Sequence, residues 1–165
     1  MQNHGFLPPT STQDRYGVGM PWWRGKRPPT EPAGRNRNRI AVVKVLYIED
    51  NDDDVYMLKM RLELLGNFEV LTAEDGETGS EMAAAEQPDI ILMDLEMPVV
   101  DGWEAARRLK GNRQTQDIPI IALSAHALTG EREKAIAAGC EEFDTKPIEF
   151  DRLVATVRRV LDGRK

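Results

Sequence analysis

The chain is 165 residues long and 41% of its residues are hydrophobic, which suits one globular domain and excludes an entirely disordered chain. It contains no apolar run of about 18 residues and no apolar leader with a cleavage site, so we expect neither a membrane span nor secretion. Cys140 is the only cysteine, which excludes an internal disulfide and agrees with the cytoplasmic location that we expect.

Charge divides the chain into two parts. Residues 1–40 hold seven Lys and Arg residues against two acidic ones, contain six of the ten prolines, and lack a periodic apolar pattern. We interpret them as a disordered basic tail of net charge +5. Residues 41–165 hold 15 basic and 26 acidic residues, a net charge of −11, and form the expected globular domain. Such an acidic domain repels a polyphosphate backbone, so we expect no nucleic-acid partner.

From residue 42 onward, short apolar runs alternate with segments of helical periodicity. The runs predict strands at residues 42–48, 68–72, 90–93 and 118–123, and we expect a short fifth strand at residues 142–145. We expect a first helix after the acidic capping stretch 51–54, and further helices at residues 77–86, 103–110, 131–138 and 149–161. The apolar faces predicted for the first two helices include Leu65 and Ala85.

This alternation of strand and helix, repeated five times, predicts an α/β fold with parallel strands and helices on both faces of the sheet. Five such units in about 120 residues fit a flavodoxin-like doubly wound (βα)5 domain with strand order 2-1-3-4-5. In such sheets, ligands bind beyond the carboxyl ends of the strands, where the strand order reverses. The residues that follow the strands therefore indicate the functional site.

Acidic residues follow two strands that we expect to be neighbours. Glu49 and Asp50 follow the first strand, and Asp94 follows the third. Three crowded carboxylates disfavour one another's ionisation unless a cation lies among them, and oxygen ligands of this kind suit Mg²⁺. Ser124 and Lys146, after the fourth and fifth strands, add a hydroxyl and an ammonium group. Together these groups can stabilise a phosphoryl group in transfer, with Asp94 as the nucleophile that forms an acyl phosphate.

The same residues lie in motifs that resemble those of response regulator receiver domains. The resemblance runs from about residue 43 to residue 163, and its motifs are VLYIEDN at 45–51, ILMDLEMP at 91–98, DG at 101–102, LSA at 123–125 and TKP at 145–147. It implies that Asp94 accepts a phosphoryl group from a phosphohistidine on a sensor histidine kinase or a histidine phosphotransfer protein. Asp50, Asp94 and the backbone carbonyl of Glu96 would hold Mg²⁺, and Glu49 would act mainly through a metal-bound water. Lys146 would pair with the phosphoryl group.

The resemblance also implies a conformational switch. Ser124 would move to bond the phosphoryl group, and Phe143 matches the aromatic switch residue of the family. Pro147 matches a proline that follows a cis peptide bond. Gly102 lies where the loop after Asp94 needs a permissive backbone.

Two residues depart from the common pattern of receiver domains. Glu96, two residues after Asp94, is expected to alter the lifetime of the acyl phosphate, in a direction that the sequence leaves open. Phe143 lacks the hydroxyl of a tyrosine, so its inward and outward positions should differ chiefly in packing. His126, two residues after Ser124, is expected at the rim of the site.

The sequence stops soon after the last predicted helix, so we expect a stand-alone, non-enzymatic response regulator with an unknown downstream protein target. Its expected output surface comprises the fourth helix, the fifth strand and the fifth helix. A relay intermediate and a terminal regulator remain alternatives, and residues 125–132 resemble receivers attached to hybrid sensor kinases. Two other interpretations are a pseudo-receiver that binds partners without phosphorylation and, least favoured, an aspartyl-phosphate phosphatase, which usually carries a second Asp where this chain has Glu96.

Overall fold

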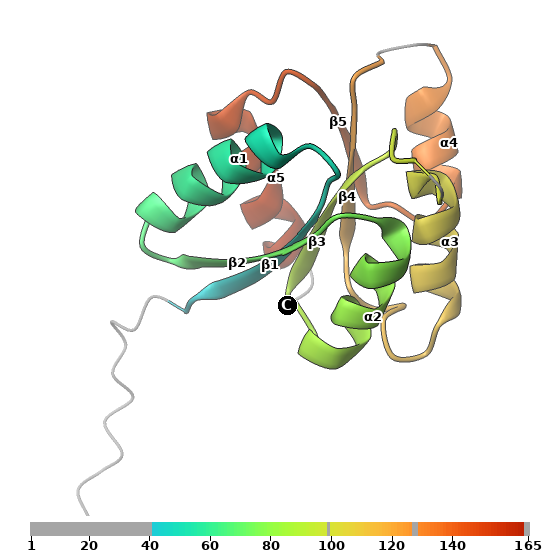
Figure 1. Cartoon of the computed structure of the whole chain (residues 1–165), viewed down its shortest axis with the longest axis horizontal. Helices are drawn as coiled ribbons and strands as arrows, with labels where there is room; N and C mark the ends of the chain where they lie inside the picture. The colour runs from blue at the N-terminus through green and yellow to red at the C-terminus, as the bar shows by residue number, and fades with distance from the viewer. Residues whose placement is uncertain (1–40, 99, 127–128, 164–165) are drawn as a thin grey trace, which may run out of the picture. The chain divides into compact units, whose positions relative to one another are not determined.

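The computed structural model describes residues 41–98, 100–126 and 129–163, so the predicted basic tail, residues 1–40, lies outside the described residues. Strands and helices alternate along the described chain (Figure 1). The strands are β1 (Val43–Ile48), β2 (Phe68–Ala73), β3 (Ile90–Asp94), β4 (Ile120–Ser124) and β5 (Glu142–Thr145). The helices are α1 (Asp52–Leu64), α2 (Gly76–Glu86), α3 (Gly102–Gly111), α4 (Glu131–Ala137) and α5 (Phe150–Asp162). Each predicted element is present, with small differences at the ends.

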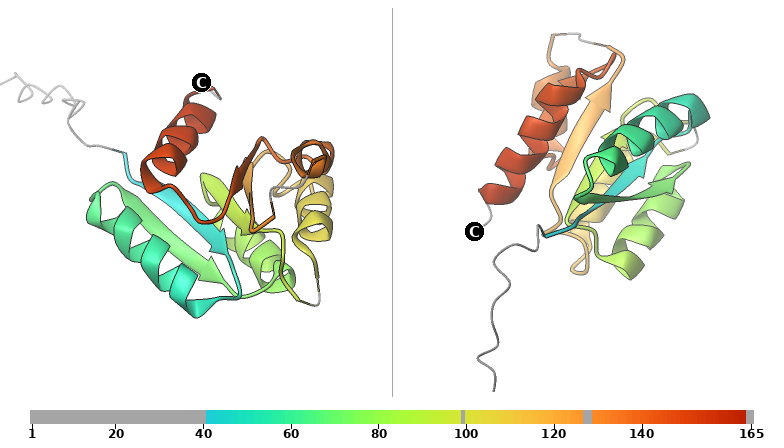
Figure 2. Two further views of the ribbon diagram at one scale, coloured as in Figure 1. Left: turned by 90° about the horizontal axis from the view of Figure 1, so that it is seen from above. Right: turned by 90° about the vertical axis from the view of Figure 1, so that its left-hand side faces the viewer.

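The five strands form one parallel sheet in the order β2-β1-β3-β4-β5, which confirms the predicted flavodoxin-like topology. Helices α1 and α5 cover one face of the sheet, and α2, α3 and α4 cover the other (Figures 1 and 2). The strand order reverses between β1 and β3, where Ile48 lies opposite Met93 in the register. The residues that follow these two strands therefore lie side by side.

The hydrophobic core has two layers because the sheet is covered on both faces. Every residue of β3 and β4 is buried. Alternate residues of β1 supply the two layers, since successive side chains of a strand point to opposite faces. Leu46 and Ile48 pack with residues of α2, α3 and α4, whereas Val45 and Tyr47 pack with residues of α1 and α5.

Two predicted core positions are wrong. Leu65 is the C-cap of α1 and is 45% exposed, because it lies beyond the last turn that packs on the sheet. Ala85 is exposed, and α2 instead buries Gly76, Gly79 and Ala83. The glycines let this helix approach the sheet closely: a Cβ on Gly79 would lie 2.4 Å from Cδ1 of Ile48.

Capping side chains fix where the helices near the strand ends begin. Asn51 Oδ1 accepts hydrogen bonds from the backbone N–H groups of Asp53 and Asp54, at 3.0 and 3.1 Å. Asp101 does the same for the N–H of Glu104, at 2.8 Å. The first cap starts α1 directly after Glu49 and Asp50, and the second starts α3 at Gly102, after the loop that follows Asp94. Within the described residues, no helix has the length and apolar character needed to cross a membrane.

Candidate functional site

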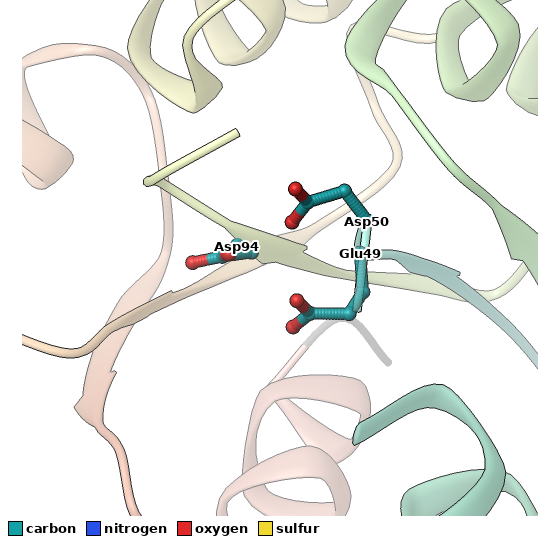
Figure 3. Close-up of side chains that lie close together, drawn as sticks. All are labelled: Glu49, Asp50 and Asp94. Carbon is teal, nitrogen blue, oxygen red and sulfur yellow. The ribbon is translucent and has the colours of Figure 1, made fainter. Parts of the chain in front are cut away.

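Three carboxylates converge at the carboxyl ends of β1 and β3. Glu49, Asp50 and Asp94 each offer an oxygen, and these oxygens lie within 4.8 Å of one another (Figure 3). Glu49 and Asp94 are buried, with 2% and 4% of their surface exposed, whereas Asp50 is exposed. The structure therefore brings together the three acidic residues that the sequence assigned to one crevice, and leaves one side of the cluster open to solvent.

Asp94, the last residue of β3, has a different partner on each carboxylate oxygen. Its Oδ1 accepts a hydrogen bond from the backbone N–H of Glu96 at 3.2 Å. Its Oδ2 lies 3.5 Å from Nζ of Lys146. The Asp94 carboxylate therefore lies between a backbone N–H donor and the ammonium group of a lysine.

The ammonium group of Lys146 links the acidic residues. Its Nζ lies 2.5 Å from Glu49 Oε2 and 3.2 Å from Asp54 Oδ2, in addition to its contact with Asp94. Partial burial favours the neutral amine, but hydrogen bonding to Glu49 and the surrounding negative charge outweigh it and raise the pKa of Lys146 to about 12. The sequence missed Asp54 as a partner, because nothing in its local pattern distinguishes it from the other aspartates of the first turn of α1.

Glu49 has hydrogen-bond donors on both carboxylate oxygens. Oε2 accepts from the hydroxyl of Tyr47 at 2.7 Å and from Lys146, and Oε1 accepts from the backbone N–H of Asn51 at 3.3 Å. Burial raises the pKa of Glu49 above its ordinary value, although the hydrogen bonds from Lys146 and Tyr47 oppose this shift. A bound cation would lower this raised pKa, since positive charge beside a buried carboxyl favours its ionised form.

The donor set fits a hard divalent cation. All three ligand atoms are carboxylate oxygens, which favours Mg²⁺ over the softer transition metals. Because Asp50 is exposed, the cluster also has room for the waters that Mg²⁺ usually retains. Within ranges 41–98, 100–126 and 129–163, this is the one group of three or more His, Cys, Asp or Glu residues whose ligand atoms lie this close together.

The hydroxyl of Ser124, a residue that is 1% exposed, hydrogen-bonds to groups at the rim of the site. Its Oγ lies 3.1 Å from both Glu96 Oε1 and Glu131 Oε2 and 3.0 Å from the carbonyl oxygen of His126. A hydroxyl has one proton, so it donates to one of these acceptors at a time. The sequence placed Ser124 in the site but did not indicate its contact with Glu131, because Glu131 reaches it from the first turn of α4.

Glu96 and His126 form a pair at the same rim, where Nδ1 of His126 contacts Oε1 of Glu96. The hydrogen bond to Glu96, together with its charge, raises the pKa of His126. Partial desolvation alone would raise the pKa of Glu96, but the hydrogen bonds from His126 and Ser124 outweigh it and lower that pKa. The exposed position of His126 agrees with the sequence, whereas its pairing with Glu96 was not predicted.

We expect the pKa of His126 to lie above about 6.5, the ordinary histidine value, and to return toward that value in the Glu96→Gln variant. Because the folded-state pKa is raised, the pair stabilises the fold fully below the ordinary pKa and loses this contribution as the pH rises through the raised pKa. An NMR titration of the His126 ring measures both pKa values. Identical titration curves for the wild type and Glu96→Gln would contradict the pairing.

Three further predicted residues lie around the site. Phe143 is half-buried in β5 and packs against the core layer of α2, α3 and α4. The peptide bond between Lys146 and Pro147 is cis, as predicted. Gly102 is needed for space rather than for a positive φ: a Cβ there would lie 2.4 Å from the backbone oxygen of Asp94.

Comparison with known proteins assigns the class of domain that this fold and site define. The profile of the response regulator receiver domain matches residues 45–158, which is more than half of the chain. The chain therefore belongs to the response regulator receiver family, whose members act in two-component signalling.

Individual relatives agree with this assignment. The polar-differentiation response regulator DivK of Brucella ovis is 32% identical over 117 residues, which cover 71% of this chain and 94% of DivK. The receiver domain of a sensor histidine kinase from Pseudomonas aeruginosa, solved with magnesium in its active site cleft, is 33% identical with a TM-score of 0.68, and the match covers 74% of this chain and 99% of that one. Chemotaxis response regulator CheY4 of Vibrio cholerae is 28% identical with a TM-score of 0.67, over 73% of this chain and 99% of CheY4.

Proposed function

We propose that this receiver accepts a phosphoryl group on Asp94 from a phosphohistidine of a sensor histidine kinase or histidine phosphotransfer protein, and signals by protein–protein contact. One observation carries the proposal: the Asp94 carboxylate lies both in the acidic cluster and 3.5 Å from the ammonium group of Lys146. The proposed nucleophile therefore belongs to the acidic cluster and is also paired with a positive charge.

In the proposed transfer, an oxygen of Asp94 attacks the phosphorus atom and the phosphorus–nitrogen bond of the phosphohistidine breaks. The imidazole leaves with the electron pair, and an acyl phosphate forms on Asp94. Lys146, already paired with Asp94, would balance the charge of the phosphoryl oxygens. Asp50, Asp94 and the backbone carbonyl of Glu96 would hold Mg²⁺, and Glu49 would act through a metal-bound water. When bound, the ion supplies Lewis-acid neutralisation of the phosphoryl oxygens.

Ser124 and Phe143 are the proposed switch residues. To donate to a phosphoryl oxygen, the Ser124 hydroxyl would turn away from Glu96 and Glu131, which both lie within hydrogen-bonding distance of it. Because Glu131 belongs to α4, this exchange would break a direct side-chain contact between β4 and α4. Phosphorylation adds a charge of about −1.5 to −2, which would shift the population toward the inward position of Ser124 and Phe143.

The face formed by α4, β5 and α5 is the proposed output surface, because the contact between Ser124 and Glu131 connects it with the site. Ion pairs hold its three elements together in the present state. Glu142 of β5 pairs with Arg132 of α4 at 3.3 Å and with Arg159 of α5 at 3.0 Å. A shift of α4 would break the Arg132 pair and change the charges presented to a downstream protein.

Phosphotransfer profiling tests the proposal. Each histidine kinase of the source organism is autophosphorylated with labelled ATP and mixed briefly with the full chain and Mg²⁺. We expect fast labelling by one or a few kinases and no labelling of the Asp94→Asn variant. Equal labelling of the two chains, or no labelling by any kinase or by acetyl phosphate, would contradict the proposal.

A chase of the labelled chain separates the two kinds of regulator that the sequence left open. Passage of the label to a histidine phosphotransfer protein would identify a relay intermediate. Retention of the label on the chain through repeated additions of that protein would identify a terminal regulator.

Glu96→Gln is expected to raise the phosphorylated fraction at a fixed, limiting concentration of acetyl phosphate roughly fivefold, corresponding to about 1 kcal/mol. Glu96 adds a further negative charge at the rim of the site, and an amide of nearly the same shape removes its repulsion of the phosphoryl group. Separation of the two forms on a phosphate-affinity gel measures the fraction. The matched control is Glu104→Gln on α3, whose carboxylate pairs with Arg107 and Arg108. An unchanged or smaller fraction in Glu96→Gln would contradict this charge effect.

A further inference from the structure

Tyr47 is a buried polar residue for which the proposed function gives no role. It lies in β1, is 0% exposed, and belongs to the core layer under α1 and α5. Residues two apart in a strand share a face, so Tyr47 and Glu49 point to the same side of the sheet. The phenol hydroxyl donates to Glu49 Oε2 at 2.7 Å. A tyrosine of the core thus contacts an acidic residue of the site directly.

The phenol acts here as a hydrogen-bond donor. Burial, reinforced by the charge of Glu49, raises the pKa of Tyr47, so the proton stays on the phenol oxygen. Glu49 Oε2 therefore has one donor from the core, Tyr47, and one from the site, Nζ of Lys146 at 2.5 Å. The two donors differ in how many groups they serve, because the Tyr47 ring is packed in the core and its hydroxyl donates to Glu49, whereas Nζ of Lys146 is shared with Asp54 and Asp94.

We propose that Tyr47 is a positioning residue for the metal site, whose hydroxyl fixes the Glu49 carboxylate in the orientation that serves both Mg²⁺ and Lys146. The inference rests on the proposed function, because it takes Glu49 to act toward Mg²⁺, directly or through water. Without the hydroxyl, Oε2 retains only Lys146 as a side-chain donor from the described residues, and the ammonium group of Lys146 is shared with Asp54 and Asp94. Some residues do not bind the metal but hydrogen-bond to a metal ligand and orient it. Removing such a residue typically weakens metal binding by about 10- to 100-fold.

The test is the Mg²⁺ affinity of Tyr47→Phe, measured on the unphosphorylated full chain by following the backbone amides of Asp50 and Glu96 by NMR during a MgCl₂ titration at constant ionic strength. Phenylalanine keeps the ring in the core and removes only the hydroxyl. We expect Mg²⁺ to bind about tenfold more weakly than to the wild type. The control is Tyr56→Phe on α1, which removes a hydroxyl from a tyrosine that is 66% exposed and should leave the affinity unchanged.

The same substitution made in the Glu49→Gln variant distinguishes a positioning role of Tyr47 from a general loss of structure. If Tyr47 acts through Glu49, adding Tyr47→Phe to Glu49→Gln should change the Mg²⁺ affinity by less than about twofold, because the ionised acceptor is already gone. The same tenfold loss in both backgrounds would overturn the proposal, and so would an unchanged affinity of Tyr47→Phe alone. Because no phosphodonor is present, these outcomes are independent of whether Asp94 is phosphorylated.

Discussion

Asp94→Asn is expected to abolish covalent phosphorylation of the chain by acetyl phosphate, because an amide lacks the nucleophilic oxygen that forms the acyl phosphate. Asparagine has nearly the same shape, and its Oδ1 can keep the hydrogen bond from the Glu96 N–H, which is 3.2 Å long in the structure. The fold should therefore persist while the reaction is lost. Intact-mass spectrometry after incubation with acetyl phosphate and Mg²⁺ measures the phosphorylated fraction, which should fall by more than about 100-fold.

The control for this variant is Asp117→Asn, because Asp117 is exposed and precedes β4, at the edge of the sheet opposite the site. It should be phosphorylated as the wild type is. If Asp94→Asn gained phosphate to the same extent as Asp117→Asn, another residue would have to be the acceptor.

Lys146→Ala is expected to lower the initial rate of phosphorylation by about 100-fold or more, the range typical for loss of one preorganised group that stabilises transition-state charge. Lys146 lies 3.5 Å from Asp94 and remains protonated over the physiological range, because its pKa is raised to about 12. Its loss leaves the incoming phosphoryl charge facing Glu49 and Asp54 without their shared counter-ion. Initial rates with acetyl phosphate at saturating Mg²⁺ measure the effect.

Mg²⁺ affinity gives this variant a second readout. Removing a cation beside the acidic cluster should leave Mg²⁺ binding unchanged or tighter, so rate and metal affinity should not fall together. Lys44→Ala is the control, since Lys44 pairs with Glu86 at the other end of β1. A parallel fall in rate and Mg²⁺ affinity would show that Lys146 supports the structure of the site rather than the transfer.

The fold could be predicted from the sequence because its signals are local. The central strands β3 and β4 are apolar runs, and residues such as Asn51 and Asp101 cap the helices that follow strands. The wrong core positions arise where three-dimensional packing determines which side chains of a helix are buried. Ala85 looks like a core residue in the helical pattern, but α2 approaches the sheet through Gly79, which turns Ala85 outward.

Only part of the candidate site could be predicted, because some of its residues approach from elements that the sequence does not place next to it. Residues placed by a strand end, such as Asp50 and Asp94, could be assigned to one crevice because parallel strands end at the same edge. Partners that approach from other elements could not. Glu131 reaches Ser124 from α4, and Asp54 reaches Lys146 from α1, although both look like ordinary acidic residues in the first turn of a helix.

The position of the phosphoryl group on the wild-type chain is the most direct test of the central claim. Borohydride reduces an aspartyl phosphate to homoserine, and peptide mass spectrometry after digestion then identifies the modified residue. The proposed role of Asp94 predicts homoserine at position 94 after treatment with a phosphodonor and Mg²⁺, and none without the phosphodonor. Homoserine at Asp50 or another carboxylate, with position 94 unmodified, would contradict it.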